Sequence, residues 1–240
     1  MALSPDNLLL ILGAFVAAVV SASAGFGGAL LLLPLLVRSV GPEAAVPLLT
    51  VAQLAGNGTR VAAGWREIDW RPAGLFLLGA LPAAVAGAHL FLDLPPGLLT
   101  RLAGLAILLF VALGWAGWRP PAGIGWLPAT GAMTGFVSGV VGSAGPLGAA
   151  AFLALGLPPA TYVATEAVTA LAMHGAKLMV WGGAAALPAG FWPLAALLAA
   201  AMVAGTLVAR RLVARIPARL FRRLVGALLL LVGGQMLIAG

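Results

Sequence analysis

The stretch Ser21-Ala22-Ser23-Ala24-Gly25-Phe26-Gly27-Gly28 divides an uncharged run that covers residues 7–37. A helix needs about 20 apolar residues to cross a bilayer, because it rises about 1.5 Å per residue across about 30 Å of hydrocarbon. The run is therefore too long for one span and too short for two full spans with a turn. It predicts a re-entrant hairpin, whose two half-helices meet at the glycines.

A second uncharged run, residues 126–156, is broken in the same way at Gly142-Ser143-Ala144-Gly145-Pro146. Further along, Val85-Ala86-Gly87 recurs as Val203-Ala204-Gly205. Five other pairs share one offset of 117 positions (for example 138 − 21): Ser21 with Ser138, Gly25 with Gly142, Gly28 with Gly145, Asn57 with His174, and Arg60 with Lys177. The sequence therefore predicts a duplication, with an N-terminal repeat over residues 1–119 and a C-terminal repeat over residues 120–240.

Three ordinary helices should follow each break. In the first repeat we expect them over residues 44–63, 72–92 and 98–118. In the second repeat we expect them over residues 160–181, 191–208 and 220–238. Each repeat would then contain a hairpin that returns to its own side of the membrane and three crossings, which is an odd number.

The charges of equivalent loops predict that the two repeats have opposite orientations. The loop that follows Arg60 carries Arg66 and Arg71, whereas its counterpart, residues 181–190, is uncharged. One helix later the pattern reverses: residues 91–97 carry only Asp93, and their counterpart carries Arg210, Arg211, Arg215, Arg219 and Arg222. Basic loops collect on the cytoplasmic side of a membrane. We therefore predict an all-α integral membrane protein of two inverted-topology repeats, with both termini outside the cytoplasm.

Composition supports one membrane domain with no soluble domain. Hydrophobic residues make up 62% of the 240 residues and charged residues 8%, whereas a soluble domain carries about 25% charged residues. The net charge of +7 is clustered in loops, so nucleic acid is not an expected partner. The chain has no cysteine and no HExxH, GxSxG or Walker pattern. We expect no enzymatic activity, no catalytic residue, no cofactor and no metal site.

The two glycine-rich breaks are the predicted substrate site. Non-helical backbone at membrane depth is tolerated only inside protein or beside a water-filled cavity. Each break starts a new helix, whose N–H groups and positive dipole end favour an anion. Small residues would let a solute approach the backbone, and serines would add hydroxyl donors. The predicted substrate-binding residues of the breaks are Ser21, Ser23, Gly25, Phe26, Gly27, Gly28, Ser138, Gly142, Ser143, Ala144 and Gly145. The alternative is that these small residues serve only close helix packing.

Polar residues on the helix after each break should face the same site. Asn57 and its counterpart His174 are predicted to bind the substrate, and His174 could carry a coupled proton because its reference pKa is near neutrality. Ionisable residues inside a membrane are costly and usually functional. Gating or coupling roles are therefore predicted for Gln53, Arg60, Glu166 and Lys177. The alternative for the charged residues near helix ends is snorkelling to the interface.

Tryptophans lie at the ends of the predicted segments. Indole rings prefer the membrane–water interface. We therefore expect interfacial anchors at Trp65, Trp70, Trp115, Trp118, Trp126, Trp181 and Trp192.

The first break resembles that of a known transporter family. Ser23-Ala24-Gly25-Phe26-Gly27-Gly28, followed by Leu33-Pro34-Leu35, is similar to the TauE/SafE family of sulfite and organosulfonate exporters. The likeness covers the whole chain, including the duplication. It is looser at the second break, where the family often has a run of glycines. The resemblance implies a multi-pass carrier in the bacterial inner membrane, which moves sulfite, sulfoacetate or a related oxyanion and is coupled to protons.

Two other functions remain open from the sequence. A passive anion channel would use the same helix dipoles along a continuous hydrated path. A membrane scaffold or assembly protein would need no paired polar residues at the breaks. A homo-oligomer is compatible with all three functions.

Overall fold

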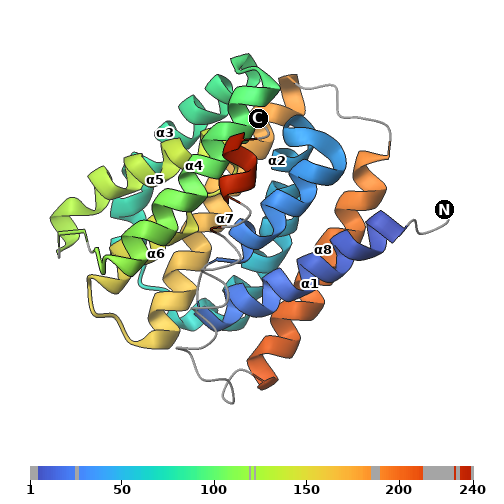
Figure 1. Cartoon of the computed structure of the whole chain (residues 1–240). Helices are drawn as coiled ribbons and strands as arrows, with labels where there is room; N and C mark the ends of the chain where they lie inside the picture. Colours follow the sequence, from blue (N-terminus) through green and yellow to red (C-terminus); the bar gives the residue numbers. More distant parts are fainter. Residues whose placement is uncertain are drawn as a thin grey trace.

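The computed structural model describes residues 5–24, 27–118, 120–121, 123–184, 190–212, 230 and 233–238. Over these residues the chain is a bundle of α-helices without β-strands (Figure 1), so the predicted all-α class is confirmed. Two short 3-10 turns, Trp65–Glu67 (η1) and Ile124–Trp126 (η2), lie between helices. The α-helices are α1 (Pro5–Ala24), α2 (Gly28–Gly64), α3 (Trp70–Asp93), α4 (Pro96–Trp115), α5 (Leu127–Val141), α6 (Gly145–Leu153), α7 (Pro159–Ala184) and α8 (Phe191–Leu212).

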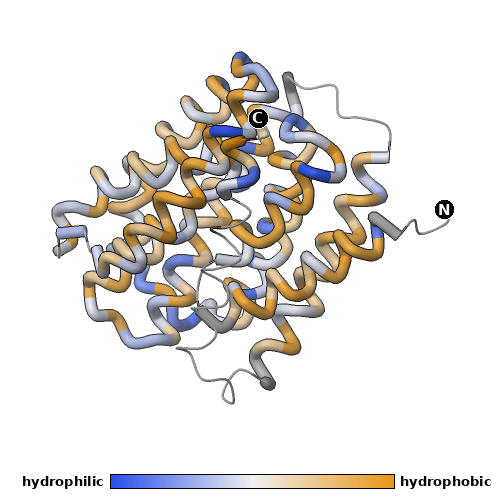
Figure 2. The backbone as a smooth tube through the Cα atoms, viewed as in Figure 1, coloured by the Kyte–Doolittle hydropathy of each residue, from blue (hydrophilic) through white to orange (hydrophobic). Residues whose placement is uncertain are grey.

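The helices have the length and surface of membrane spans. Figure 2 shows hydrophobic residues along most of each helix, with hydrophilic residues concentrated toward helix ends and loops. Leucines in the middle of helices are exposed, such as Leu78 and Leu105, which suits contact with lipid rather than water. Five segments of the described chain are long and apolar enough to cross a membrane: Gly28–Glu67, Trp70–Asp93, Pro96–Trp115, Ile124–Val141 and Phe191–Ala209. Most of the helix predicted over residues 220–238 lies outside the described residues.

Both predicted breaks interrupt the helices, and glycine makes each of them possible. Gly27 precedes α2 with a φ of 98°, and Gly142 ends α5 with a φ of 89°. This left-handed region costs a residue with a Cβ atom free energy that glycine avoids. The arms on the two sides of each break are unequal: α5 has 15 residues and α6 has 9.

The second arm of the first break continues directly into the next helix. α2 has 37 residues and contains one non-helical residue, Gly41, with φ 77° and ψ 162°. Pro42 follows it, and proline favours the first turn of a new helix. In the second repeat the corresponding place is a true loop between α6 and α7.

The most extensive helix contacts join the two predicted repeats. These contacts pair α3 with α5, α1 with α8, and α2 with α7. By sequence offset α1 corresponds to α5, α3 to α8, and α2 to α7. The first helix of each repeat therefore packs on a later helix of the other repeat, as the adjacent ribbons of α1 and α8 show (Figure 1). Residues 1–119 and residues 120–240 therefore pack through exchanged helices and not as two separate units.

Close approach of these helices depends on glycine. A Cβ atom on Gly135 would lie 2.1 Å from the backbone oxygen of Ala80, and one on Gly131 would lie 2.1 Å from that of Phe76. Gly87 and Gly205 are sequence counterparts of each other. A Cβ atom on Gly87 would lie 2.4 Å from the backbone oxygen of Phe136, and one on Gly205 would lie 2.5 Å from that of Phe15. For these glycines, small-residue packing is the observed role.

Six of the seven tryptophans are exposed at segment ends, in agreement with the expected anchors: Trp65, Trp70, Trp115, Trp118, Trp126 and Trp192. Trp181 is the exception, because it is fully buried. Its indole N–H donates to the Ala88 oxygen at 3.1 Å, and its ring lies 5.2 Å from that of Phe91. The prediction of an interfacial anchor at Trp181 is therefore wrong. The indole N–H finds its hydrogen-bond partner inside the protein and the ring packs on Phe91, so Trp181 does not need the membrane–water interface.

We predict that Gly135→Ala lowers the stability of the protein in detergent. The added methyl group would overlap the α3 backbone, and overpacking costs about 1–3 kcal/mol. That cost should exceed the gain of about 1 kcal/mol in helix propensity. Thermal unfolding followed by tryptophan fluorescence measures the effect. Gly74→Ala is the control, because its Cβ would meet nothing within 4 Å. Equal unfolding midpoints for the two variants would show that close α3–α5 packing is unimportant.

Candidate functional site

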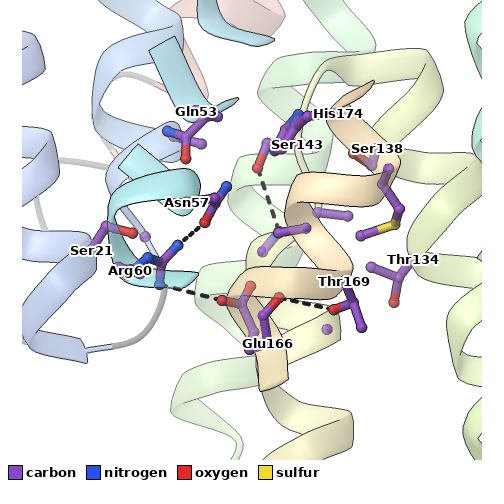
Figure 3. Close-up of a pocket in the computed structure, with 17 residues that line it drawn as sticks. Ser21, Gln53, Asn57, Arg60, Thr134, Ser138, Ser143, Glu166, Thr169 and His174 are labelled. Atoms are coloured by element: carbon purple, nitrogen blue, oxygen red, sulfur yellow. Dashed lines mark hydrogen bonds and ion pairs between the residues drawn. The ribbon is translucent and has the colours of Figure 1, made fainter. Parts of the chain in front are cut away.

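A small cavity lies where the two helix breaks meet α2 and α7 (Figure 3). Its volume of about 30 Å³ has room for roughly two water molecules. Residues from both repeats line it. The predicted site residues on its walls are Ser21, Gly27, Gln53, Asn57, Arg60, Ser138, Ser143, Ala144, Gly145, Glu166 and His174.

The other predicted residues are not among those that line the cavity. Gly28 packs against α1, where a Cβ would lie 2.2 Å from the Ala17 oxygen. Lys177 donates a hydrogen bond to the backbone oxygen of Gly142 and another to Ser138, which does line the cavity. Gly25 and Phe26 lie outside the described residues, as does the side chain of Ser23.

Several lining residues were missed by the sequence analysis. Thr134 lies one helical turn before Ser138, and Gly148 lies one turn after Gly145. The helical repeat also connects Glu166 to residues further along α7. Extending each predicted position by three or four residues would have found most of the missed group: Ala29, Thr134, Gly148, Thr169, Ala170 and Met173.

Two buried nitrogen atoms on the cavity walls have no hydrogen-bond partner in the described structure. They are Nε2 of Gln53, on α2, and Nδ1 of His174, on α7. Buried polar atoms in folded proteins are nearly always hydrogen-bonded, because desolvation without a partner is costly. These atoms therefore mark the part of the cavity that is suited to a polar ligand. Figure 3 shows Gln53 and His174 on facing elements, with Ser143 beside His174.

An ion pair between α2 and α7 forms another part of the cavity wall. Arg60 Nη1 donates to Glu166 Oε2 at 3.3 Å, and Nη2 donates to Asn57 Oδ1. Arg60 and Asn57 belong to α2, whereas Glu166 belongs to α7. Both charged side chains are less than 9% exposed. Arg60 and Glu166 are therefore buried side chains and do not snorkel to an interface.

Lys177 has a different environment, although it is the sequence counterpart of Arg60. It is the one lysine of the chain and is fully buried. Its Nζ donates to the backbone oxygen of Ser138 at 3.1 Å and to the hydroxyl Oγ of the same residue at 2.8 Å. It also donates to the backbone oxygen of Gly142 at 2.8 Å. These bonds satisfy carbonyls at the C-terminal end of α5, which also carries negative partial charge. Lys177 thus holds the end of α5 in place behind the cavity.

The first backbone N–H groups of α6 are already occupied. The Gly145 N–H donates to Ser143 Oγ at 3.4 Å, and Pro146 has no N–H. The N–H groups of Leu147 and Gly148 donate to the Ala144 oxygen. The expectation of exposed N–H donors at this tip is therefore wrong. Side-chain groups, including the Ser143 hydroxyl, are the available donors, while the helix still directs its positive end here.

A comparison with protein-family models matches residues 10–236 to the family described as Sulfite exporter TauE/SafE. The chain belongs to this family. The match covers nearly the whole chain, and it confirms the resemblance found at the first break. Family membership implies a membrane transporter of sulfite or organosulfonates and is consistent with a protein that is not an enzyme. Comparisons with curated proteins and with solved structures gave no match.

We predict that Lys177→Met destabilises the protein by about 1–3 kcal/mol, since it leaves buried acceptors on α5 without a donor. Lys177→Arg should restore only part of this loss, because a wide guanidinium replaces a compact ammonium. Thermal unfolding in detergent measures both. Arg71→Met removes an exposed cation and is the control. A loss no larger than that of Arg71→Met would contradict a supporting role for Lys177.

Proposed function

We propose that the protein is a secondary transporter that carries a small sulfur oxyanion, such as sulfite, sulfoacetate or a related organosulfonate. The substrate would bind in the cavity between the two breaks. The observation that supports this most directly is the pair of unpartnered nitrogen atoms, Gln53 Nε2 and His174 Nδ1, on its walls. A multi-oxygen anion can accept a hydrogen bond from each of two such groups at once.

The remaining donors of the cavity suit an anion as well. Ser21, Ser138 and Ser143 place hydroxyl groups on its lining, and α6 directs the positive end of its dipole toward it. An anion that leaves water must regain a large solvation free energy from such groups. Serine and amide donors supply such hydrogen bonds.

The size of the cavity supports a carrier more than a channel. A cavity of about 30 Å³ is not a continuous hydrated path. A carrier binds its solute in a compact site and opens that site to each side in turn. The helices around the cavity would therefore move during transport.

Proton coupling is proposed to act through His174. An anion bound beside the imidazole would favour its protonated form, so the binding of anion and proton would reinforce each other. Asn57, the counterpart of His174, cannot gain a charge. Such positive coupling would carry the anion and a proton across the bacterial inner membrane in the same direction, with the outward anion gradient driving export.

We further propose that the repeats, residues 1–119 and 120–240, have inverted topology, each with a re-entrant hairpin and three spans. The opposite charges of equivalent loops support this, and so does the exchanged packing of α1 with α8 and α5 with α3. Inverted repeats with broken helices at the centre are common in secondary transporters. Both termini would then lie outside the cytoplasm.

Single cysteines in this cysteine-free chain can test the topology. A cysteine at Arg66 should be shielded from an impermeant thiol reagent added outside intact cells. A cysteine at Ala186, in the counterpart loop outside the described residues, should react. Labelling of both positions from the same side would exclude inversion. Reaction at 66 from outside, with 186 shielded, would instead reverse the proposed orientation.

Gln53→Leu should raise the half-saturating sulfite concentration by about tenfold or more, because a hydrogen bond to a charged group contributes about 1.5–3 kcal/mol. Counterflow of labelled sulfite in proteoliposomes measures this and separates a carrier from a channel. Thr50→Val is the matched control: Thr50 Oγ1 is buried and unpartnered on the same helix but does not line the cavity. Equal effects of the two variants would contradict the site.

We expect sulfite flux to depend on pH and His174→Asn to flatten that dependence while some flux remains. Asparagine can still donate a hydrogen bond but cannot take up a proton. The initial rate of flux at a series of pH values measures this. An unchanged pH profile in the variant would place proton coupling at another residue.

A further inference from the structure

The cavity has two oppositely charged residues on its lining, and they neutralise each other. Arg60 and Glu166 form an ion pair at 3.3 Å. Lys177 is also nearby, but the three N–H bonds of its ammonium group go to Ser138 and Gly142. An anion entering the cavity therefore meets a cation that is already bound to a carboxylate.

The chemistry of that pair resembles the chemistry of the proposed ligand. A carboxylate and a sulfur oxyanion both present several acceptor oxygens, and a guanidinium binds either with its planar set of N–H donors. The Arg60–Glu166 hydrogen bond of 3.3 Å is longer than the usual length of about 2.7–2.9 Å for a charged pair. A second oxyanion at this place would compete with Glu166 for the same cation.

We propose that Glu166 is a built-in competitor of the transported anion. In the described structure the Glu166 carboxylate is bound to the Arg60 guanidinium. The substrate displaces this carboxylate from Arg60 when it binds. This inference rests on the proposed function, since it assigns a role within the same anion site.

The displacement would also connect binding to movement. The Arg60–Glu166 bond joins α2 to α7, which are counterparts in the two repeats. Beside Glu166 on α7, Thr165 Oγ1 accepts from the N–H of Asp69, the residue before α3, at 3.0 Å. Substrate binding would break the ionic link between α2 and α7 and leave this bond between α7 and the start of α3. A ligand can shift a conformational equilibrium only through such a difference in contacts between two states.

Sulfite binding to the purified full-length protein in detergent tests the inference. Isothermal titration calorimetry at one fixed pH would compare the wild type with Glu166→Gln, which keeps the shape of the side chain and removes its charge. We expect Glu166→Gln to bind sulfite about tenfold or more tightly, because close charge pairs are strongly coupled. Glu67→Gln removes an exposed carboxylate from η1 and should leave affinity unchanged. Arg60→Gln should weaken binding, and adding Glu166→Gln to it should give no gain.

The rise in unfolding temperature caused by sulfite provides a second measurement, because a ligand stabilises the state that binds it. The rise should be larger for Glu166→Gln than for the wild type. If Glu166→Gln does not fold, Glu166→Asp replaces it, since the shorter carboxylate reaches Arg60 less well and should also bind sulfite more tightly. Sulfite binding by the wild type without a gain in the Glu166 variants would overturn this inference alone. No binding of sulfite or organosulfonates by any variant would overturn the proposed function itself.

Discussion

Hydrocarbon offers no hydrogen-bond partner to a peptide group, so a helix end that is buried in a membrane protein must find its partners within the protein. The end of α5 satisfies this requirement through Lys177, whose ammonium group bonds to Ser138 and Gly142. The start of α6 satisfies it through Ser143, which accepts from the Gly145 N–H. These contacts hold the second break open as a wall of the cavity. Without them, the backbone between α5 and α6 would have to become helical or move to water.

The exchanged packing of the helices explains why the cavity lies between residues 1–119 and residues 120–240. α1 and α5 each end at a break, and each packs on a helix of the other repeat. Glycine at the crossing points, such as Gly135, lets backbones approach within van der Waals distance. Any movement of one repeat relative to the other must therefore change the cavity. This is the property that a carrier with alternating access requires.

The sequence predicted the breaks because their causes are local. Gly27 and Gly142 adopt left-handed backbone that few other residues accept, and the repeat offset brought Asn57 and His174 into correspondence. Contacts between distant residues could not be predicted in this way. Arg60 and Glu166 are 106 positions apart, and the helical pattern of either residue gives no sign of its partner. Trp181 was misassigned for the same reason, because a position near the end of a segment does not show which side chains will cover it.

The central claim is that a sulfur oxyanion binds between Gln53 and His174. Selenite is the selenium analogue of sulfite, and its anomalous X-ray scattering locates it directly in a crystal of the protein. The expected result is a selenium peak in the cavity, within hydrogen-bond distance of Gln53 Nε2 and His174 Nδ1, that disappears when excess sulfite is added. A cavity without selenium, or peaks only on the outer surface, would contradict the claim.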